Sequence, residues 1–164
     1  MDNFLQRLRK TINYNKETGE FHWKTSLKNN QIKIGSMAGT IRRDGRTQIQ
    51  FDGKLYLAYR LAWLLTYEKW PDFEIDHIDG DPSNNRIDNL RDVNRSENSQ
   101  NRRKPNKNKI NKILGVYKQK HDKKWHTRIF FLNKSLYVGR FDTAEEASEA
   151  YLKAKRIYHK GCTI

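Results

Sequence analysis

Cysteine and long apolar runs are what this chain of 164 residues has least of. Its one cysteine, Cys162, excludes an internal disulfide and a cysteine-based zinc cluster. Its most apolar stretch, residues 55–67, is interrupted by Arg60 and is too short to span a membrane. The first residues, MDNFLQRLRK, lack the apolar segment of a signal peptide. We therefore expect a cytoplasmic protein that has no membrane partner.

Acidic residues are also few relative to basic ones. The chain has 33 Lys and Arg and 19 Asp and Glu, which gives a formal net charge of +14. A positive field of this size attracts polyanions and speeds encounter with them, so nucleic acid is the expected partner. Hydrophobic residues make up only 35% of the chain. Such a composition predicts several small modules, each with a small core that a bound metal or DNA would help to stabilise.

The N-terminal region, residues 1–56, is predicted to be rich in β-structure. Apolar residues at helical spacing indicate a short helix over 1–9, and the sequence NKETGEFHWK is typical of strand, turn and strand. Alternating polar and apolar residues between glycines predict a small antiparallel sheet over 20–57. Its basic residues are Arg42, Arg43 and Arg46. They either contact DNA or form the solvated face of an ordinary sheet, and the sequence leaves both interpretations open.

The middle of the chain combines a helix, two strands and a polar loop around a few residues suited to chemistry. Leucines at spacings of three and four predict a helix over 56–69, which Pro71 ends. We expect strands at 73–77 and within 86–93, separated by the polar loop 79–85. Asn94 and Glu97 resemble a capping box and predict a helix over 95–103.

Three residues of this middle segment could serve phosphodiester chemistry. Asp76 and Asn98 can supply the oxygen ligands that a hard divalent cation prefers. His77 belongs to the residue type that titrates near neutral pH and can act as a general base. A lone Asp-His pair is more often a surface turn, and a calcium-binding EF-hand is excluded because its sixth and twelfth positions would be Asn84 and Leu90.

Residues 57–103 resemble HNH endonucleases of the phage and intron-encoded homing type, through DHIDGD, NNRIDNL and RSEN in that order. The resemblance implies two strands and a helix around one metal, the ββα-metal motif. It implies His77 as the general base, Asp76 and Asn98 as ligands of Mg²⁺ (or Mn²⁺), and Asn89 as the residue that holds the loop and orients His77. Many members carry a second histidine where Asn98 stands, so this chain matches the homing subgroup and disfavours zinc.

Residues 104–112 form a predicted basic linker with nothing apolar to bury. The basic run begins with Arg102, Arg103 and Lys104, which we expect to follow DNA phosphates. A solubilising hinge is the alternative interpretation.

The C-terminal region, residues 113–164, is predicted to contain three short strands followed by one helix. Thr143 and Glu146 form a capping box, alanines continue the apolar stripe, and Gly161 is expected to end the helix. The pieces LGVY, KKWHTRI and YVGRFDTAEEASEAY resemble the Apetala-type DNA-binding domain of plant ethylene-response factors. The resemblance implies that the sheet enters the major groove, while we assign Trp125 to the core. The expected DNA contacts are Lys118, Gln119, Lys124, Arg128 and Tyr137.

The predicted fold class is α+β: a small N-terminal antiparallel sheet, a central ββα-metal motif, and a three-stranded antiparallel sheet packed on one helix. The predicted function is a metal-dependent, site-specific endonuclease that hydrolyses double-stranded DNA, nicking it as a monomer or cutting both strands as a homodimer. The resemblance implies a phage gene expressed in a bacterial host. A non-enzymatic DNA-binding regulator and a binder of structured RNA remain the alternatives.

Overall fold

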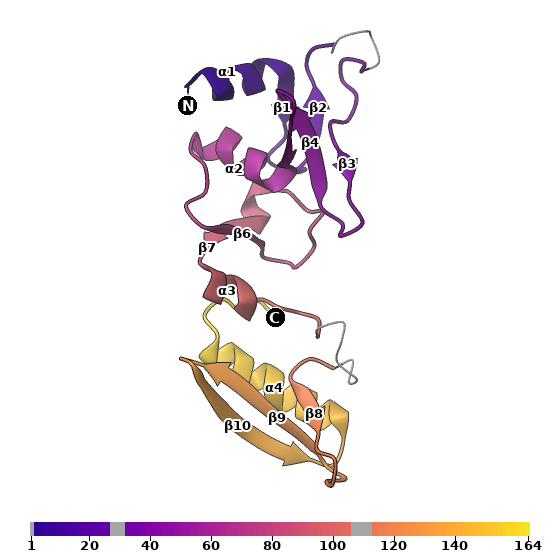
Figure 1. The fold of residues 1–164 in the computed structure, drawn as a ribbon, viewed down its shortest axis with the longest axis vertical. Coiled ribbons are helices and arrows are strands. Elements are labelled where there is room, and N and C mark those ends of the chain that lie inside the picture. The colour runs from indigo at the N-terminus through magenta and orange to yellow at the C-terminus, as the bar shows by residue number, and fades with distance from the viewer. Residues whose placement is uncertain (1, 27–31, 106–112) are drawn as a thin grey trace. The chain divides into compact units, whose positions relative to one another are not determined.

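The computed structural model describes residues 2–26, 32–105 and 113–164, which form two compact units, Met1–Asn94 and Arg95–Ile164 (Figure 1). The fold is α+β with small antiparallel sheets in both units, as predicted. Most of the predicted linker, 106–112, lies outside the described residues. Within the described parts of the chain, no helix is long and apolar enough to cross a membrane.

The first unit begins with helix α1, Asp2–Thr11, and a hairpin of β1, Ile12–Tyr14, and β2, Phe21–Trp23. A second sheet follows, in the order β3, Thr40–Ile41, β4, Thr47–Phe51, and β5, Lys54–Leu57. The single sheet expected over 20–57 is therefore divided in two, and an isolated bridge pairs His22 of β2 with Met37, which precedes β3. The turn at Gly19, where φ is +78°, folds β2 back onto β1, so β2 does not pair along β3.

The rest of the first unit carries the predicted helix and strand pair. Helix α2, Ala58–Tyr67, ends at Glu68, which adopts the left-handed conformation three residues before Pro71. Strand β6, Glu74–His77, pairs antiparallel with β7, Leu90–Val93, which follows a short 3₁₀ helix, Ile87–Asn89. The predicted strands are therefore confirmed.

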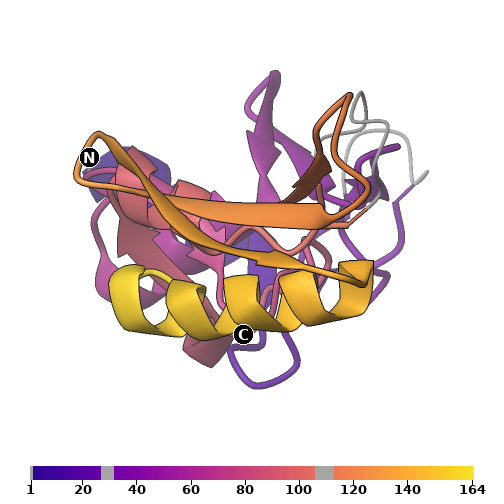
Figure 2. The same cartoon turned by 90° about the horizontal axis from the view of Figure 1, so that it is seen from below.

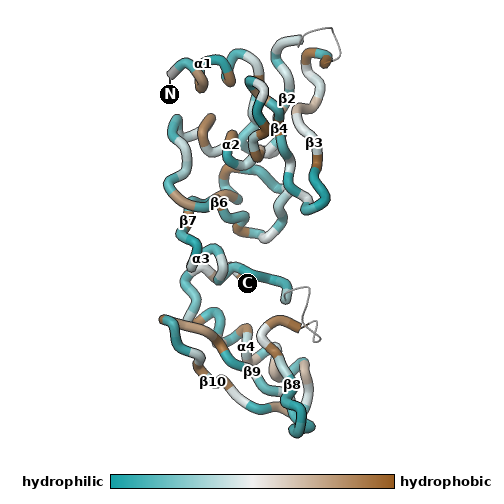
Figure 3. The backbone as a smooth tube through the Cα atoms, viewed as in Figure 1, coloured by the Kyte–Doolittle hydropathy of each residue, from teal (hydrophilic) through white to brown (hydrophobic). Residues whose placement is uncertain are grey.

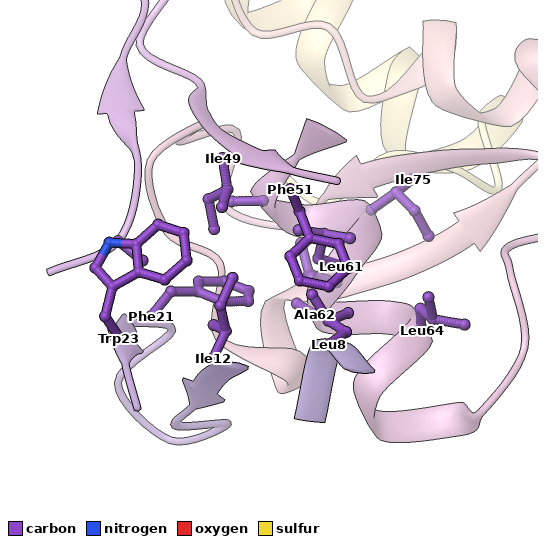
Figure 4. Close-up of a cluster of buried hydrophobic side chains, with 13 residues drawn as sticks. Leu8, Ile12, Phe21, Trp23, Ile49, Phe51, Leu61, Ala62, Leu64 and Ile75 are labelled. Carbon is purple, nitrogen blue, oxygen red and sulfur yellow. The ribbon is translucent and has the colours of Figure 1, made fainter. Parts of the chain in front are cut away.

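One hydrophobic core unites the elements of the first unit (Figure 4). Leu8 of α1, Ile12 of β1, Ile49 of β4 and Leu61 of α2 are almost fully buried, and Ile75 of β6 packs with them. Figure 3 shows the apolar residues in short runs along a largely polar chain. Because each element contributes only a few of them, the strand that carries Asp76 and His77 depends on the N-terminal elements for its stability.

The second unit contains α3, Arg95–Gln100, then β8, Val116–Lys118, β9, Trp125–Phe131, β10, Lys134–Phe141, and α4, Ala144–Tyr158. The sheet order is β10-β9-β8, and α4 lies along the sheet (Figure 2). Helix α3 is shorter than the predicted helix over 95–103. Helix α4 ends at Tyr158 rather than at Gly161, because the next residue, His159, adopts an extended conformation.

Helix α4 packs on the sheet through small side chains. Ala147 and Ala154 are buried against the face that carries Val116 and Ile129. Trp125 is only half-buried, with Lys118 Nζ 5.0 Å from its ring centroid, so it lies at the margin of this core rather than within it.

Gly115 adopts a φ of +75°, and a Cβ there would lie only 2.2 Å from the ring of Tyr151. Glycine therefore allows the chain to enter β8 directly against α4.

Replacing Thr143 with alanine should destabilise the second unit by about 1 kcal/mol, because it removes an N-cap. The Thr143 side chain accepts a hydrogen bond from Glu146 N at 3.2 Å, and Glu146 Oε2 accepts one from Thr143 N at 3.2 Å. Chemical denaturation of the full chain measures the change. Thr143→Ser keeps the oxygen and should stay close to the parent, whereas an alanine variant of unchanged stability would contradict the cap.

Candidate functional site

Strand β6 ends with Asp76 and His77, which are only 8% and 7% exposed. Successive side chains of a strand point to opposite faces, so the side chains of Asp76 and His77 leave the end of β6 on opposite faces of the strand. The His77 imidazole meets the edge of the Tyr59 ring from α2, with centroids 5.3 Å apart and ring planes at 86°. Its Nε2 lies 3.4 Å from Asn85 Oδ1. The imidazole is therefore held between a helix and the polar loop.

Burial lowers the pKa of His77 below its usual value. The hydrogen bond with Asn85 and the charge of Asp79 act in the opposite direction, while the charge of Arg46 lowers the pKa further. The net shift is downward, so the imidazole is neutral at pH 7 and can accept a proton.

Asp76 is bound by its cross-strand neighbour. Arg91 stands opposite Asp76 in the β6–β7 pair, and its Nη2 and Nε donate to Asp76 Oδ2 at 2.7 and 3.0 Å. Both bonds go to the same carboxylate oxygen. The carboxylate is thereby oriented in a nearly buried position, as an oxygen ligand for a hard cation would need to be.

Asn89 fixes the polar loop between the two strands. Its side-chain Nδ2 donates to Asp79 Oδ1 and to the carbonyl of Asn84, both at 2.9 Å, and its Oδ1 accepts from Asp79 N at 3.0 Å. The side chain that meets the His77 ring nitrogen is Asn85, which the sequence did not single out. In the sequence, Asn85 is marked only by the Asn84-Asn85 pair at the end of the loop, and asparagine is common in turns.

The β1–β2 hairpin supports the loop from the N-terminal side. Tyr14 donates its hydroxyl proton to the carbonyl of Asn85 at 2.7 Å. A Cβ on Gly19 would lie 2.6 Å from Arg86 N, so the hairpin turn approaches the loop as closely as only glycine permits. The conformation of Asn85 therefore depends on elements far away in sequence.

The turn between β3 and β4 brings basic residues to the same loop. A Cβ on Gly45 would lie 3.0 Å from Pro82 Cγ, so the turn lies beside the loop. Arg42 and Arg46 both pair with Asp44, at 3.5 and 3.1 Å, while Arg43 is exposed. The three arginines predicted to contact DNA thus gather in one turn next to the loop of the candidate site.

The remaining predicted ligand, Asn98, lies on α3 in the second unit, so its approach to Asp76 stays a prediction. Among the described residues, no three His, Cys, Asp or Glu side chains form a group that could hold a metal ion. The predicted donor set contains one carboxylate and one amide, and it would leave most positions around a cation to water and DNA phosphates. Oxygen donors of this kind fit Mg²⁺, which usually retains waters and uses substrate phosphates as ligands.

The second unit presents a polar and aromatic face on its sheet, opposite α4. Cross-strand register places Tyr117 beside His126 and Tyr137 beside Arg128, all on the same face. The Arg128 guanidinium lies 4.7 Å from the Tyr117 ring centroid, and its Nε donates to the Tyr117 hydroxyl at 2.9 Å. Tyr137 is exposed. Arg128 and Tyr137, both predicted DNA contacts, are therefore adjacent.

A hydrogen-bonded network of His126, Asp122 and Arg140 lies at one end of this face. His126 Nε2 lies 2.7 Å from Asp122 Oδ2, and Arg140 donates to Asp122 Oδ1 at 2.8 Å. The hydrogen bond from Arg140 is the largest cause that holds the pKa of Asp122 well below its usual range. His126 Nδ1 is 3.2 Å from the Tyr137 hydroxyl, so the network orients an exposed tyrosine.

The other predicted DNA contacts of this unit are dispersed. Lys118 and Gln119 are exposed near the end of β8, and Lys124 Nζ pairs with Asp142 at 2.8 Å. The basic residues after α3 are also exposed, namely Arg102, Arg103 and Lys104.

Residues 56–100 match the model of the HNH endonuclease family. The chain therefore contains an HNH endonuclease family domain, which includes α2, β6, β7 and α3 and points to action on DNA. No curated protein matches the chain. The three-stranded sheet packed on α4 has the arrangement expected of an Apetala-type domain, although this second resemblance stays a prediction.

Proposed function

We propose that the chain is a metal-dependent, site-specific DNA endonuclease of the homing type, which hydrolyses phosphodiester bonds in double-stranded DNA. One observation carries the proposal: a neutral, buried His77 is held beside an oriented carboxylate, Asp76, inside an HNH endonuclease family domain. A monomer would nick one strand, whereas a homodimer with two sites would cut both.

In the proposed mechanism His77 accepts the proton of the attacking water. Asn85 Oδ1 can only accept a hydrogen bond, so its 3.4 Å contact favours the tautomer with the proton on Nε2 and leaves Nδ1 as the basic nitrogen. Tyr59 and Asn85 restrict rotation of the imidazole, and Asn89 keeps Asn85 in place through the loop.

Asp76 and Asn98 are the residues that would hold the metal, together with DNA phosphate oxygens. When bound, Mg²⁺ polarises the scissile phosphate and stabilises the leaving 3′-oxygen. Arg91 holds Asp76 in position through two hydrogen bonds to Oδ2. Attack by water on the phosphorus with departure of the 3′-oxygen leaves a 5′-phosphate and a 3′-hydroxyl.

The chemistry of the nick tests this proposal. DNA ligase seals only a nick that carries a 5′-phosphate and a 3′-hydroxyl, so relaxed circles made by the protein should be resealed by ligase without prior phosphorylation. Nicks that require a kinase or a phosphatase before sealing would reject the mechanism. Tight binding of duplex DNA with no cleavage would instead favour a DNA-binding regulator, and preference for structured RNA would favour an RNA-binding protein.

The turn between β3 and β4 should contribute to DNA affinity through charge. Replacing Arg43 with glutamine is expected to weaken duplex binding. The negative slope of log K against log salt should become shallower by about 0.9, because one phosphate contact is lost. Fluorescence anisotropy at several salt concentrations measures both quantities. Lys10→Gln removes one exposed positive charge from α1 and serves as the control. Equal slopes for the two variants would argue against a special role of the turn.

The rate of cleavage should depend on pH through His77. A general base must be unprotonated, and burial lowers the His77 pKa below about 6.5, its ordinary value. The rate should therefore be constant at neutral pH and fall as the pH drops through a midpoint below about 6.5. Single-turnover rates at saturating Mg²⁺ between pH 5 and about 8 measure the profile. A midpoint above 7 would contradict the environment described for His77.

A further inference from the structure

The second unit contains a pocket of about 770 Å³ that the proposed nuclease chemistry does not use. The pocket lies beside the part of β9 that β8 does not cover. Strand β8 pairs only with residues 125–127 of β9, and β9 continues beyond them to Phe131. Residues from α3, from the start of β8 and from α4 close the pocket around this part of β9.

The charges around the pocket are all of one sign. Arg102, Arg128 and Lys155 line it, and none of the described residues that line it is an aspartate or a glutamate. Lys155 is only 1% exposed, and its Nζ donates a hydrogen bond to the carbonyl of Arg102 at 2.5 Å. Within the described parts of the chain, Lys155 forms no ion pair. A buried ammonium that lacks an anionic partner is costly, so an anion in the pocket would stabilise it.

Burial is the largest cause that shifts the pKa of Lys155; Cys162 raises this pKa, but burial together with the charges of Arg103 and Arg102 lowers it overall. A bound anion would act in the opposite direction. The cationic end of the pocket is thus suited to a phosphate, which can accept the remaining hydrogen bonds of the ammonium.

The other side of the pocket is aromatic. Phe130 is 64% exposed at its margin, and Tyr117, whose ring is covered by the Arg128 guanidinium, also lines the pocket. Exposed rings next to cationic groups are the surfaces on which unpaired nucleobases stack. Cationic and aromatic side chains therefore line the same cavity.

We propose that this pocket binds a nucleotide, with the phosphate at Lys155 and Arg102 and the base against Phe130. The nucleotide is either a free mononucleotide or one unit of a DNA strand that is out of the duplex. The inference goes beyond the proposed cleavage site and does not depend on it, because none of these residues takes part in the proposed chemistry.

Calorimetric titration of the full chain in EDTA tests the proposal without cleavage. The probes are 2′-deoxyadenosine 5′-monophosphate, deoxyadenosine, inorganic phosphate and a short single-stranded oligonucleotide. Binding of the monophosphate about tenfold tighter than deoxyadenosine and than phosphate alone would support a free nucleotide as the ligand. Binding of the oligonucleotide alone, with the same dependence on Lys155, would support a nucleotide within a strand.

Variants show whether the binding occurs in this pocket. Lys155→Met nearly keeps the length of the side chain and should lower the affinity for the probe that binds by about tenfold. Lys153→Met, on the exposed side of α4, should leave this affinity unchanged. Phe130→Ala changes an exposed side chain and should also weaken binding, which keeps the test valid if Lys155→Met does not fold. Failure of both the monophosphate and the oligonucleotide to bind, or equal losses in Lys155→Met and Lys153→Met, would overturn the proposal.

Discussion

Replacing His77 with alanine should lower the rate of DNA cleavage by about 10³-fold, the contribution typical of a positioned general base, and should leave DNA affinity unchanged. The reason lies in the surroundings of the imidazole. Tyr59 and Asn85 restrict its orientation, and burial keeps it neutral. No phosphate contact is assigned to His77, so duplex binding should not depend on it. Single-turnover cleavage and anisotropy titration on the same duplex separate the two effects.

Two further measurements make this result specific. His22→Ala changes the half-buried histidine of β2 in the same unit and should cleave at the parent rate. Free imidazole should partly restore cleavage to His77→Ala, because the cavity left by the side chain can admit it. A His77→Ala protein that cuts DNA at the parent rate, or that loses duplex binding together with cleavage, would refute the proposed role.

Replacing Asp76 with alanine should abolish metal-dependent cleavage, with a loss of about 10³-fold or more, because the proposed metal site loses its only carboxylate. Mg²⁺ titrations of the cleavage rate measure this effect. Asp88→Ala removes an exposed carboxylate of the same unit, one that pairs with Arg86, and should retain the Mg²⁺ dependence of the parent.

The ion pair between Asp76 and Arg91 requires one more variant. Alanine at position 76 also removes the carboxylate that accepts two hydrogen bonds from Arg91. A loss of cleavage caused by a displaced Arg91 must be distinguished from one caused by a missing metal ligand. The double variant Asp76→Ala, Arg91→Ala removes both groups. It should remain inactive if Asp76 binds metal. Recovery of cleavage in the double variant would show that the single substitution acted through Arg91 instead.

Local signals in the sequence predicted the elements that depend mainly on local interactions. The Thr143 and Glu146 capping box and the alanine stripe predicted the start and the packed face of α4, and both are present. The sequence NKETGEFHWK predicted a hairpin with a turn near Gly19, and β1 and β2 form it, but the single sheet expected over 20–57 was wrong, because β2 pairs with β1 and stays out of the sheet of β3, β4 and β5. Alternation shows that a segment is a strand but not which strand it pairs with.

The candidate site shows the same contrast between local and distant interactions. Asp76 and His77 stand at the end of a strand, as expected, because the apolar residue before them anchors β6 in the core. The contacts of Asn85 with His77 and Tyr14 depend on the loop conformation and on a residue 71 positions earlier, so no short pattern indicated them.

Lys155 was also missed. It directly follows an alanine of the apolar stripe, and a lysine at that point of a helix is usually exposed. Its burial depends on other parts of the second unit, including the carbonyl of Arg102 that accepts its hydrogen bond.

The most direct test of the proposed function is incubation of supercoiled phage-type DNA with the full chain, in Mg²⁺ and in EDTA. We expect conversion to open circles in Mg²⁺, or to linear DNA if two sites act together, and no conversion in EDTA. Cleavage that is equally fast in EDTA would contradict a metal-dependent HNH nuclease. Intact DNA in Mg²⁺, despite tight binding to every duplex tested, would contradict the assignment of the chain as an endonuclease.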